Sequence, residues 1–159
     1  THLQHAYVLT HGGHSLESSL SAGAHHDDDA GGGYYVGLLA IRTLFRDLER
    51  GEYSLLSKSL MALYDVYNRK EIEWLLYEDK KLGRREIAQL SKTVAKCAAE
   101  GCEQARRIFE DCAYRLAEYA YVAYLRSMNS EDAPVVLVGG LKQAGDCLIL
   151  PFKKYFPSF

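Results

Sequence analysis

The sequence predicts an α/β domain that is mostly helical and has few strands. Three observations support this prediction: a β-branched apolar run at Val135–Val138 that stops at Gly139 and Gly140, a middle region of helical periodicity, and a long apolar helix just before the run. A short run of this kind is typical of a strand buried on both faces. A long helix that leads into such a strand is typical of α/β layering.

The glycine pair at Gly139 and Gly140 gives this strand two interpretations. Because glycine has no Cβ, the backbone can turn sharply there, and a flat or anionic ligand can come close. Ligands of α/β proteins lie beyond the carboxyl ends of strands, which favours a binding site. A lone Gly-Gly also marks plain strand-to-helix turns, and at this stage both interpretations stay open.

Length and composition are those of one globular domain of 159 residues, with a quarter of the residues charged and a net charge of -2. Such a balance carries no nucleic-acid signature and no acidic tail. No apolar run approaches the ~18 residues that a membrane span needs.

The four cysteines, at positions 97, 102, 112 and 147, form no CxxC pair. Their pattern favours an intracellular reducing compartment, the cytosol or the mitochondrial matrix. No targeting peptide is visible, although the chain opens at Thr1.

The chain divides into three segments. Residues 1–33 form a glycine- and histidine-rich strand-loop segment that contains all six histidines. Residues 34–127 form a helical region, and residues 128–159 contain the strand, the Gly-Gly turn and a C-terminal segment. Within the first segment, Ala6–Leu9 is expected to be a strand, and Gly12 with Gly13 a turn.

Five helices are expected in the helical region. Gly51 and Gly101 are placed to end two of them, and Asn68 with Glu71 three residues later is typical of an N-terminal cap. The expected ranges are 34–50, Leu55–Tyr67, a helix from Asn68 through Tyr77, Arg84–Glu100 and Cys102–Ser127. The last is rich in tyrosine and apolar on several sides, which favours a central packing helix over a cofactor role.

The histidines of the first segment suggest a metal site, but weakly. His2 and His5, and likewise His11 and His14, are three residues apart, which would place two imidazoles on one metal if the segment were helical. Glycines and serines interrupt the segment, so solvated loop histidines are the favoured interpretation. The Lys153-Lys154 pair is interpreted as a solvated face, and nothing in the spacing of His14, Ser15 and Glu17 favours an acid–base set.

Three separated segments together resemble a known family. The stretch 25–37, HHDDDAGGGYYVG, follows the form GHxxGDEGSxYWIG in register at His25, Asp29, Gly31, Tyr34 and Gly37. Segments 71–77 and 86–88 look like a helical insertion, and the long helix followed by 134–140, PVVLVGG, looks like the end of a lobe. In their order and spacing they resemble the carboxyl-terminal lobe of N-acetylglucosamine kinases and the related BadF/BadG-type ATPases of the actin–hexokinase superfamily.

The resemblance implies a fold and a set of site residues. Residues 1–159 would form a single, incomplete lobe of an actin/hexokinase-like (ribonuclease H-like) ATPase fold. Gly139 and Gly140 would border the adenosine of Mg-ATP. Its phosphates would lie against Gly12, Gly13 and Ser15, and a cleft loop would contain His25, Asp29 and Gly31.

Departures from the family weaken the implied activity. The family binds phosphate with a GTGS turn, whereas the chain has Gly12-Gly13-His14-Ser15, so a glycine replaces the threonine and a histidine replaces a glycine. A side chain where the backbone must approach narrows the cradle. The family's DGGGT loop and its aspartate base, both in the amino-terminal lobe, have no counterpart in the sequence, and no catalytic residue is assigned. Phosphoryl transfer depends on such parts acting together.

Two hypotheses of different class follow. In the first, the chain is a degenerate sugar-kinase-like lobe without independent catalysis that serves as a structural or accessory subunit of a larger assembly. Its partners would then be other protein subunits, to which its many tyrosines are suited. In the second, it is the nucleotide-binding half of an N-acetylglucosamine-kinase-like phosphotransferase, and a complementary amino-terminal lobe would be supplied from outside this sequence.

Overall fold

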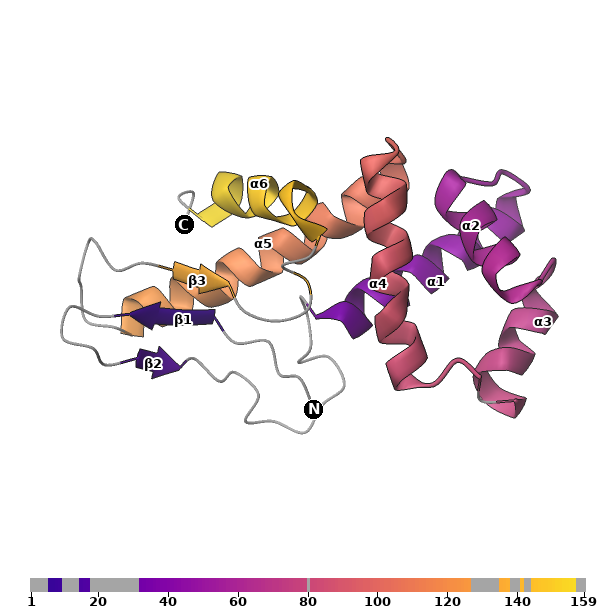
Figure 1. Cartoon of the computed structure of the whole chain (residues 1–159), viewed down its shortest axis with the longest axis horizontal. Helices are drawn as coiled ribbons and strands as arrows, with labels where there is room; N and C mark the ends of the chain where they lie inside the picture. The colour runs from indigo at the N-terminus through magenta and orange to yellow at the C-terminus, as the bar shows by residue number, and fades with distance from the viewer. Residues whose placement is uncertain are drawn as a thin grey trace. The chain divides into compact units, whose positions relative to one another are not determined.

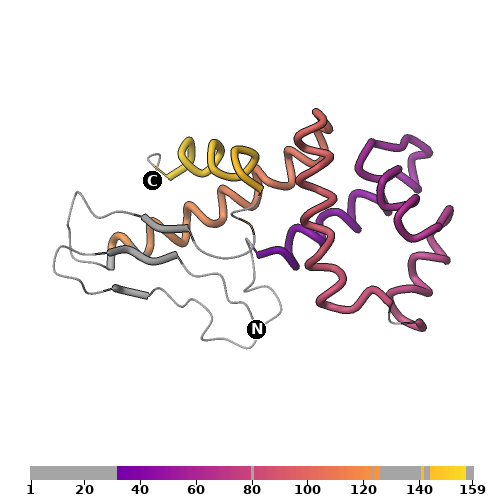
Figure 2. The backbone as a smooth tube through the Cα atoms, viewed as in Figure 1, coloured from indigo at the N-terminus to yellow at the C-terminus, as the bar shows by residue number. Residues whose placement is uncertain are grey.

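The structure, a computed structural model, falls into two compact units, a helical unit of residues 33–109 and a second unit that combines residues 1–32 with 110–159. Figure 1 labels the helices and strands, and Figure 2 traces the backbone through them. The residues that the structure describes are 6–9, 15–17, 32–79, 81–126, 135–137, 141 and 144–156.

Helix α1, Gly33–Arg50, is the first element of the helical unit. Its buried stripe contains Val36, Ala40, Ile41 and Leu44, spaced as one face of a helix requires. The helix stops at Gly51, whose φ of 69° is in the left-handed region that glycine adopts without a steric penalty. Both predicted ends are confirmed to within a residue.

Helix α4, Arg84–Ala99, crosses α1 in the same unit (Figure 1). Its buried stripe contains Ile87, Leu90 and Val94, and Gly101 follows its end with a φ of 94°. The predicted range, Arg84–Glu100, is one residue longer than the observed helix.

Helix α2, Leu55–Tyr64, is three residues shorter than predicted. Asp65 ends it in a left-handed conformation with φ 51°, and the Val66 amide donates a 3.1 Å hydrogen bond to the Met61 carbonyl. This bond turns the chain so that Val66 is buried. The apolar pattern continues to Tyr67, but α2 ends at Tyr64, and the turn that follows allows Val66 to be buried.

The predicted helix from Asn68 through Tyr77 is present in two parts, α3, Arg69–Glu73, and the π-helix η1, Trp74–Glu78. The predicted cap is confirmed, because the Asn68 side chain accepts a 3.1 Å hydrogen bond from the Glu71 amide. The π-helical turn closes when the Asp79 amide donates to the Trp74 carbonyl at 2.9 Å, five residues back.

The long helix α5, Glu103–Arg126, matches the predicted range to within a residue at each end. Its buried side chains are small or aliphatic apart from Phe109, and they include Ala105, Cys112 and Leu116. Neither α5 nor any other helix in the described part of the chain is long and apolar enough to cross a membrane. In the second unit, α6, Asp146–Tyr155, lies alongside α5 (Figure 1) and contains Pro151.

Three short strands form one antiparallel sheet in the second unit. β1, Ala6–Leu9, lies between β2, Ser15–Glu17, and β3, Val135–Leu137, with Val8 opposite both Leu16 and Val135. The strands at 6–9 and 135–137 were expected. β3 pairs with β1 in the antiparallel sense, and the burial on both faces that was expected for this strand lies outside what the structure describes.

The predicted α/β, actin/hexokinase-like fold is therefore wrong. Helices dominate the described residues, and the described strands are three or four residues long without any parallel pairing. An α/β layer requires parallel strands joined by helical crossovers. A short apolar run does not specify the direction in which its strand pairs, so the sequence pattern was compatible with both arrangements.

Candidate functional site

The residues predicted to border a nucleotide fall almost entirely outside the described residues. Gly12, Gly13, Gly139 and Gly140 lie there, as do the cleft-loop residues His25, Asp29 and Gly31. The backbone of Ser15 is described, and it pairs with Leu9 at the start of β2. The nucleotide-site assignments therefore stay predictions.

Gly37, a residue of the family-like motif, lies at a close approach of the α1 and α4 backbones. A Cβ at this position would lie 2.8 Å from the carbonyl carbon of Ile87 and closer still to its oxygen. Real Cβ atoms do not tolerate such a contact without a shift of the backbone. The glycine at this motif position is thus explained by helix packing.

The same contact between α1 and α4 continues toward the beginning of α1. A Cβ on Gly33 would lie 3.2 Å from the Ala88 carbonyl oxygen, and the Arg84 guanidinium stands 4.2 Å above the Tyr34 ring. A cation over an aromatic face at this distance is attracted by the ring quadrupole. Residues 33–37 therefore hold two helices together.

Asp47 is a buried carboxylate whose hydrogen bonds come from two serines at the start of α2. Its Oδ2 accepts from the Ser57 hydroxyl at 2.6 Å, the Ser54 hydroxyl at 2.7 Å and the Ser54 amide at 2.9 Å. Burial acts to raise the Asp47 pKa, but the hydrogen bonds from Ser57 and Ser54 and the charge of Arg46 outweigh it. The net effect is a pKa below the usual 3.8.

This network stabilises the helical unit and does not resemble an acid–base site. A general base must be free to accept a proton, whereas Asp47 is held ionised by three donors within the fold. The Ser54 hydroxyl also accepts from the Ser57 amide at 3.1 Å, which caps α2. The sequence pattern does not single out Asp47; the serines that follow the helix-ending Gly51 are the available signal.

The most unusual surface feature of the helical unit is a set of exposed aromatic side chains within residues 67–77. Tyr67, Trp74 and Tyr77, which we call the aromatic trio, are 68%, 52% and 72% exposed. Most tryptophans are largely buried, since the ring carries a large apolar area. The helix predicted over residues 71–77 is present, but Trp74 and Tyr77 lie off its buried stripe, which contains Ile72 and Leu75.

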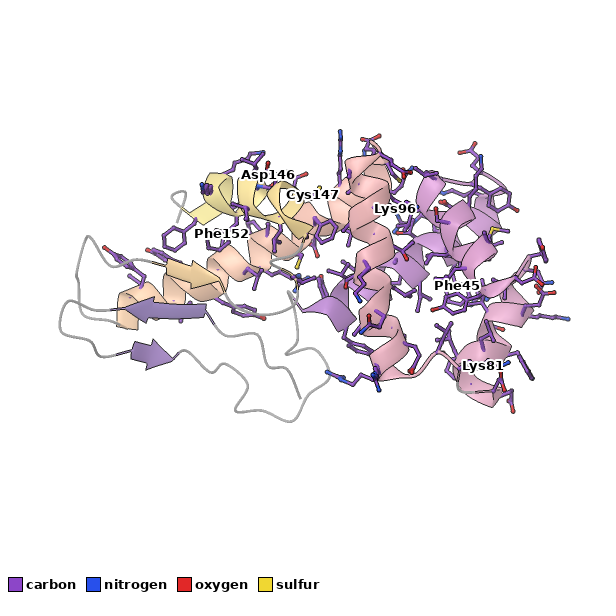
Figure 3. All side chains as sticks on the ribbon, in the orientation of Figure 1. Phe45, Lys81, Lys96, Asp146, Cys147 and Phe152 are labelled. Atoms are coloured by element: carbon purple, nitrogen blue, oxygen red, sulfur yellow. The ribbon has the colours of Figure 1, made fainter. Side chains whose placement is uncertain are left out.

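Polar groups hold this segment in place. The Glu71 carboxylate accepts from the Tyr67 amide at 2.6 Å, and the Tyr67 hydroxyl donates to Asp65 at 2.7 Å. Lys81 pairs with Asp79 at 2.8 Å and lies 5.9 Å from the centre of the Trp74 ring. Figure 3 labels Lys81 in the connection that follows η1. Hydrogen bonds at the beginning of the segment and an ion pair at its end thus fix the backbone that carries the aromatic trio.

A second polar cluster joins α5 and α6 in the second unit. The Tyr155 hydroxyl donates to Glu110 at 2.6 Å, and Lys154 approaches the same carboxylate at 3.6 Å. Tyr155 and Tyr114 meet edge to face with their centroids 5.3 Å apart. The hydrogen bond to Glu110, with a smaller contribution from burial, raises the pKa of Tyr155 above 10.0. A tyrosine held neutral in this way is a packing contact, not a proton donor near neutral pH.

The four cysteines differ in exposure. Cys97, Cys102 and Cys112 are buried, Cys147 is partly exposed, and all four are free thiols. Burial, with a smaller contribution from the Asp111 charge, raises the pKa of Cys112 far above its usual value, which keeps this thiol protonated and inert. Within the described ranges no three His, Cys, Asp or Glu side chains are grouped to hold a metal ion.

The helical unit also contains a small apolar cavity. Its lining includes Leu60, Ile72 and Leu90, and it exposes no polar atom to the space inside. It has room of about 10 Å³, no more than one water molecule occupies. A cavity of this size and chemistry belongs to core packing and admits no ligand.

Comparison with known proteins gives no further identification, because no protein-family model and no curated protein matches the chain.

Proposed function

We propose that the chain is an accessory subunit, without catalysis of its own, that binds another protein of a larger assembly through the aromatic trio. The observation that carries this proposal is the exposure of Trp74 and Tyr77, three residues apart in the π-helix η1. Tryptophan and tyrosine are enriched at protein interfaces and among the residues that contribute most to binding. Burying such a ring against a partner is worth about 1.5–3 kcal/mol.

The described chemistry supports a non-catalytic role. The buried carboxylate of Asp47 is fully hydrogen-bonded, and the Cys112 thiol is held protonated. The loose kinase-like motifs support descent from a sugar kinase of the N-acetylglucosamine kinase or BadF/BadG type, and the replacement of a family glycine by His14 supports the loss of its activity. That descent rests on the motif residues alone, because the fold expected for the family is not found.

The test is co-purification of the full chain with its partner from the native source, followed by sizing and subunit identification. Trp74→Ala with Tyr77→Ala should lose the partner, while Leu150→Ala should retain it. Leu150 is the matched control because it is an equally exposed apolar residue, at 60%, in the second unit. Unchanged circular dichroism and melting temperature would show that the variants fold. A free monomer from the native source, or a double variant that keeps its partner, would contradict the proposal.

A second candidate function is nucleotide binding, which the glycine pair after β3 favours. Under this candidate, the chain is the nucleotide-binding half of a sugar-kinase-like phosphotransferase. It would bind Mg-ATP, and a complementary lobe would supply the other half of the active site. A thermal-shift titration with Mg-ATP tests it, since a competent site gains stability as RT ln(1 + [L]/Kd). No shift at millimolar Mg-ATP would exclude this candidate.

A further inference from the structure

The outer face of α4 has a stripe of polar residues with three positive charges. Arg85, Gln89, Lys92 and Lys96 are all exposed and follow one another at intervals of four, three and four residues. Such intervals place side chains on one side of a helix. This side, which we call the basic stripe, is opposite the buried face formed by Ile87, Leu90 and Val94.

The charges of the basic stripe are not neutralised within the described part of the chain. Arg69 and Arg107 form ion pairs with acidic residues, whereas Arg85, Lys92 and Lys96 form none with any described residue. Within α4 the acidic residue is Glu86, about 100° around the helix from Arg85, and Glu100, which ends the helix four residues after Lys96, forms no described ion pair with it. Figure 3 labels Lys96 on α4. The stripe therefore presents an uncompensated positive line about 16 Å long.

We propose that the basic stripe docks an acidic helix of a protein partner. This inference rests on the proposed function and specifies the chemistry of the partner. Carboxylates at the same four-three-four intervals on a second helix would meet the three cations and the Gln89 amide along α4, as charged pairs do between neighbouring helices. A nucleic acid is the less favoured polyanion, because three cations neutralise few phosphates and the chain as a whole has a net charge of -2.

The free energy of each ion pair indicates what the basic stripe contributes to binding. One exposed ion pair changes an equilibrium by about fivefold at most. Three such pairs orient a partner and speed its association, while the affinity comes from buried apolar contacts. The stripe and the aromatic trio thus have separate roles in the same unit, and they can be tested separately.

The experiment is an amide-resolved NMR titration of the full chain with two synthetic helical peptides of identical composition. One has glutamates at four-three-four intervals on one face, and the other has them spread around the helix. The variant is Lys92→Glu with Lys96→Glu. The control is Arg42→Glu with Arg50→Glu, two exposed cations on α1. Thermal unfolding of each variant checks that it folds.

The proposal expects saturable shifts at residues 85–96 with the one-faced peptide and weaker ones with the other. The α4 variant should bind about tenfold more weakly, and the α1 control within about twofold of wild type. Absence of saturable shifts, equal loss in both variants, or tighter binding of a nucleic-acid duplex at the same amides would overturn it. If the α4 variant keeps its native partner in full while the aromatic double variant loses it, the docking inference fails and the proposed function stands.

Discussion

Gly37 of α1 lies against the Ile87 carbonyl of α4 with no room for a side chain between them. The nearest atoms to a Cβ built at position 37 belong to the Ile87 backbone, which cannot move aside as the end of a flexible side chain can. The packing of the two helices therefore depends on a missing methyl group. A methyl group added at position 37 would force α1 and α4 apart.

Gly37→Ala should destabilise the helical unit by about 2 kcal/mol or more, because overpacking against backbone outweighs the gain of about 1 kcal/mol in helix propensity. Urea unfolding measures the loss. Gly33→Ala is the control, since its Cβ would lie 3.2 Å from the Ala88 oxygen and needs only a small shift. A Gly37→Ala variant as stable as wild type would show that α1 and α4 pack less closely than described.

Asp47→Asn should cost about 1–3 kcal/mol at neutral pH, because the amide cannot accept all three hydrogen bonds from Ser54 and Ser57. The Asp47 pKa is lower in the folded chain than the usual 3.8, so its contribution is complete above that value. It is lost as the pH falls through the folded-state pKa. Urea unfolding at a series of pH values should show the wild-type advantage over the variant shrinking below about pH 4. A constant advantage at acid pH would contradict the ionised network.

Glu110→Gln should lower the pKa of Tyr155. The Glu110 carboxylate raises that pKa because it accepts a hydrogen bond from the neutral hydroxyl and is itself negatively charged, and the glutamine removes this charge. Specific ¹³C labelling of tyrosine and an NMR titration at alkaline pH measures the change. Glu118→Gln, an exposed position on the same helix, is the control and should leave that titration unchanged. An unaltered Tyr155 titration in Glu110→Gln would show that the contact between α5 and α6 does not persist in solution.

Cys147 should be the first described cysteine to react with a thiol reagent under native conditions, since the other three are buried. Cys147→Ser should remove the fast phase of the reaction. Cys112→Ser should change only the slow phase that accompanies unfolding, because burial keeps the Cys112 thiol protonated. Loss of the fast phase in Cys112→Ser would contradict the buried position of this residue.

The helices could be predicted from the sequence where periodicity and a stop signal agree. Gly51 and Gly101 end α1 and α4 because glycine adopts the left-handed conformation freely. The end of α2 was missed because Asp65 takes that conformation as well, which few residues other than glycine do. The π-helical turn at Trp74–Glu78 has no sequence pattern that distinguishes it from an α-helix.

The fold class and the candidate site could not be predicted in the same way. Val135–Leu137 was recognised as a strand, but the partner and direction of a three-residue strand are set by contacts far away in the sequence. Trp74 and Tyr77 were read as helical residues, yet their exposure depends on the register of η1. Asp47 was not singled out in the sequence, because the serines that bind it lie seven and ten residues further along the chain and reach it only in the folded structure.

The small apolar cavity beside Leu90 has a consequence for the response to pressure. Pressure unfolds proteins in proportion to the internal void that unfolding eliminates. A space that holds about one water molecule releases little volume when its walls separate, so it adds little to the pressure sensitivity of the helical unit. Truncating Leu90 to alanine would enlarge the void within a fixed frame of helices, and pressure would then favour the unfolded chain more strongly than it does in the wild type.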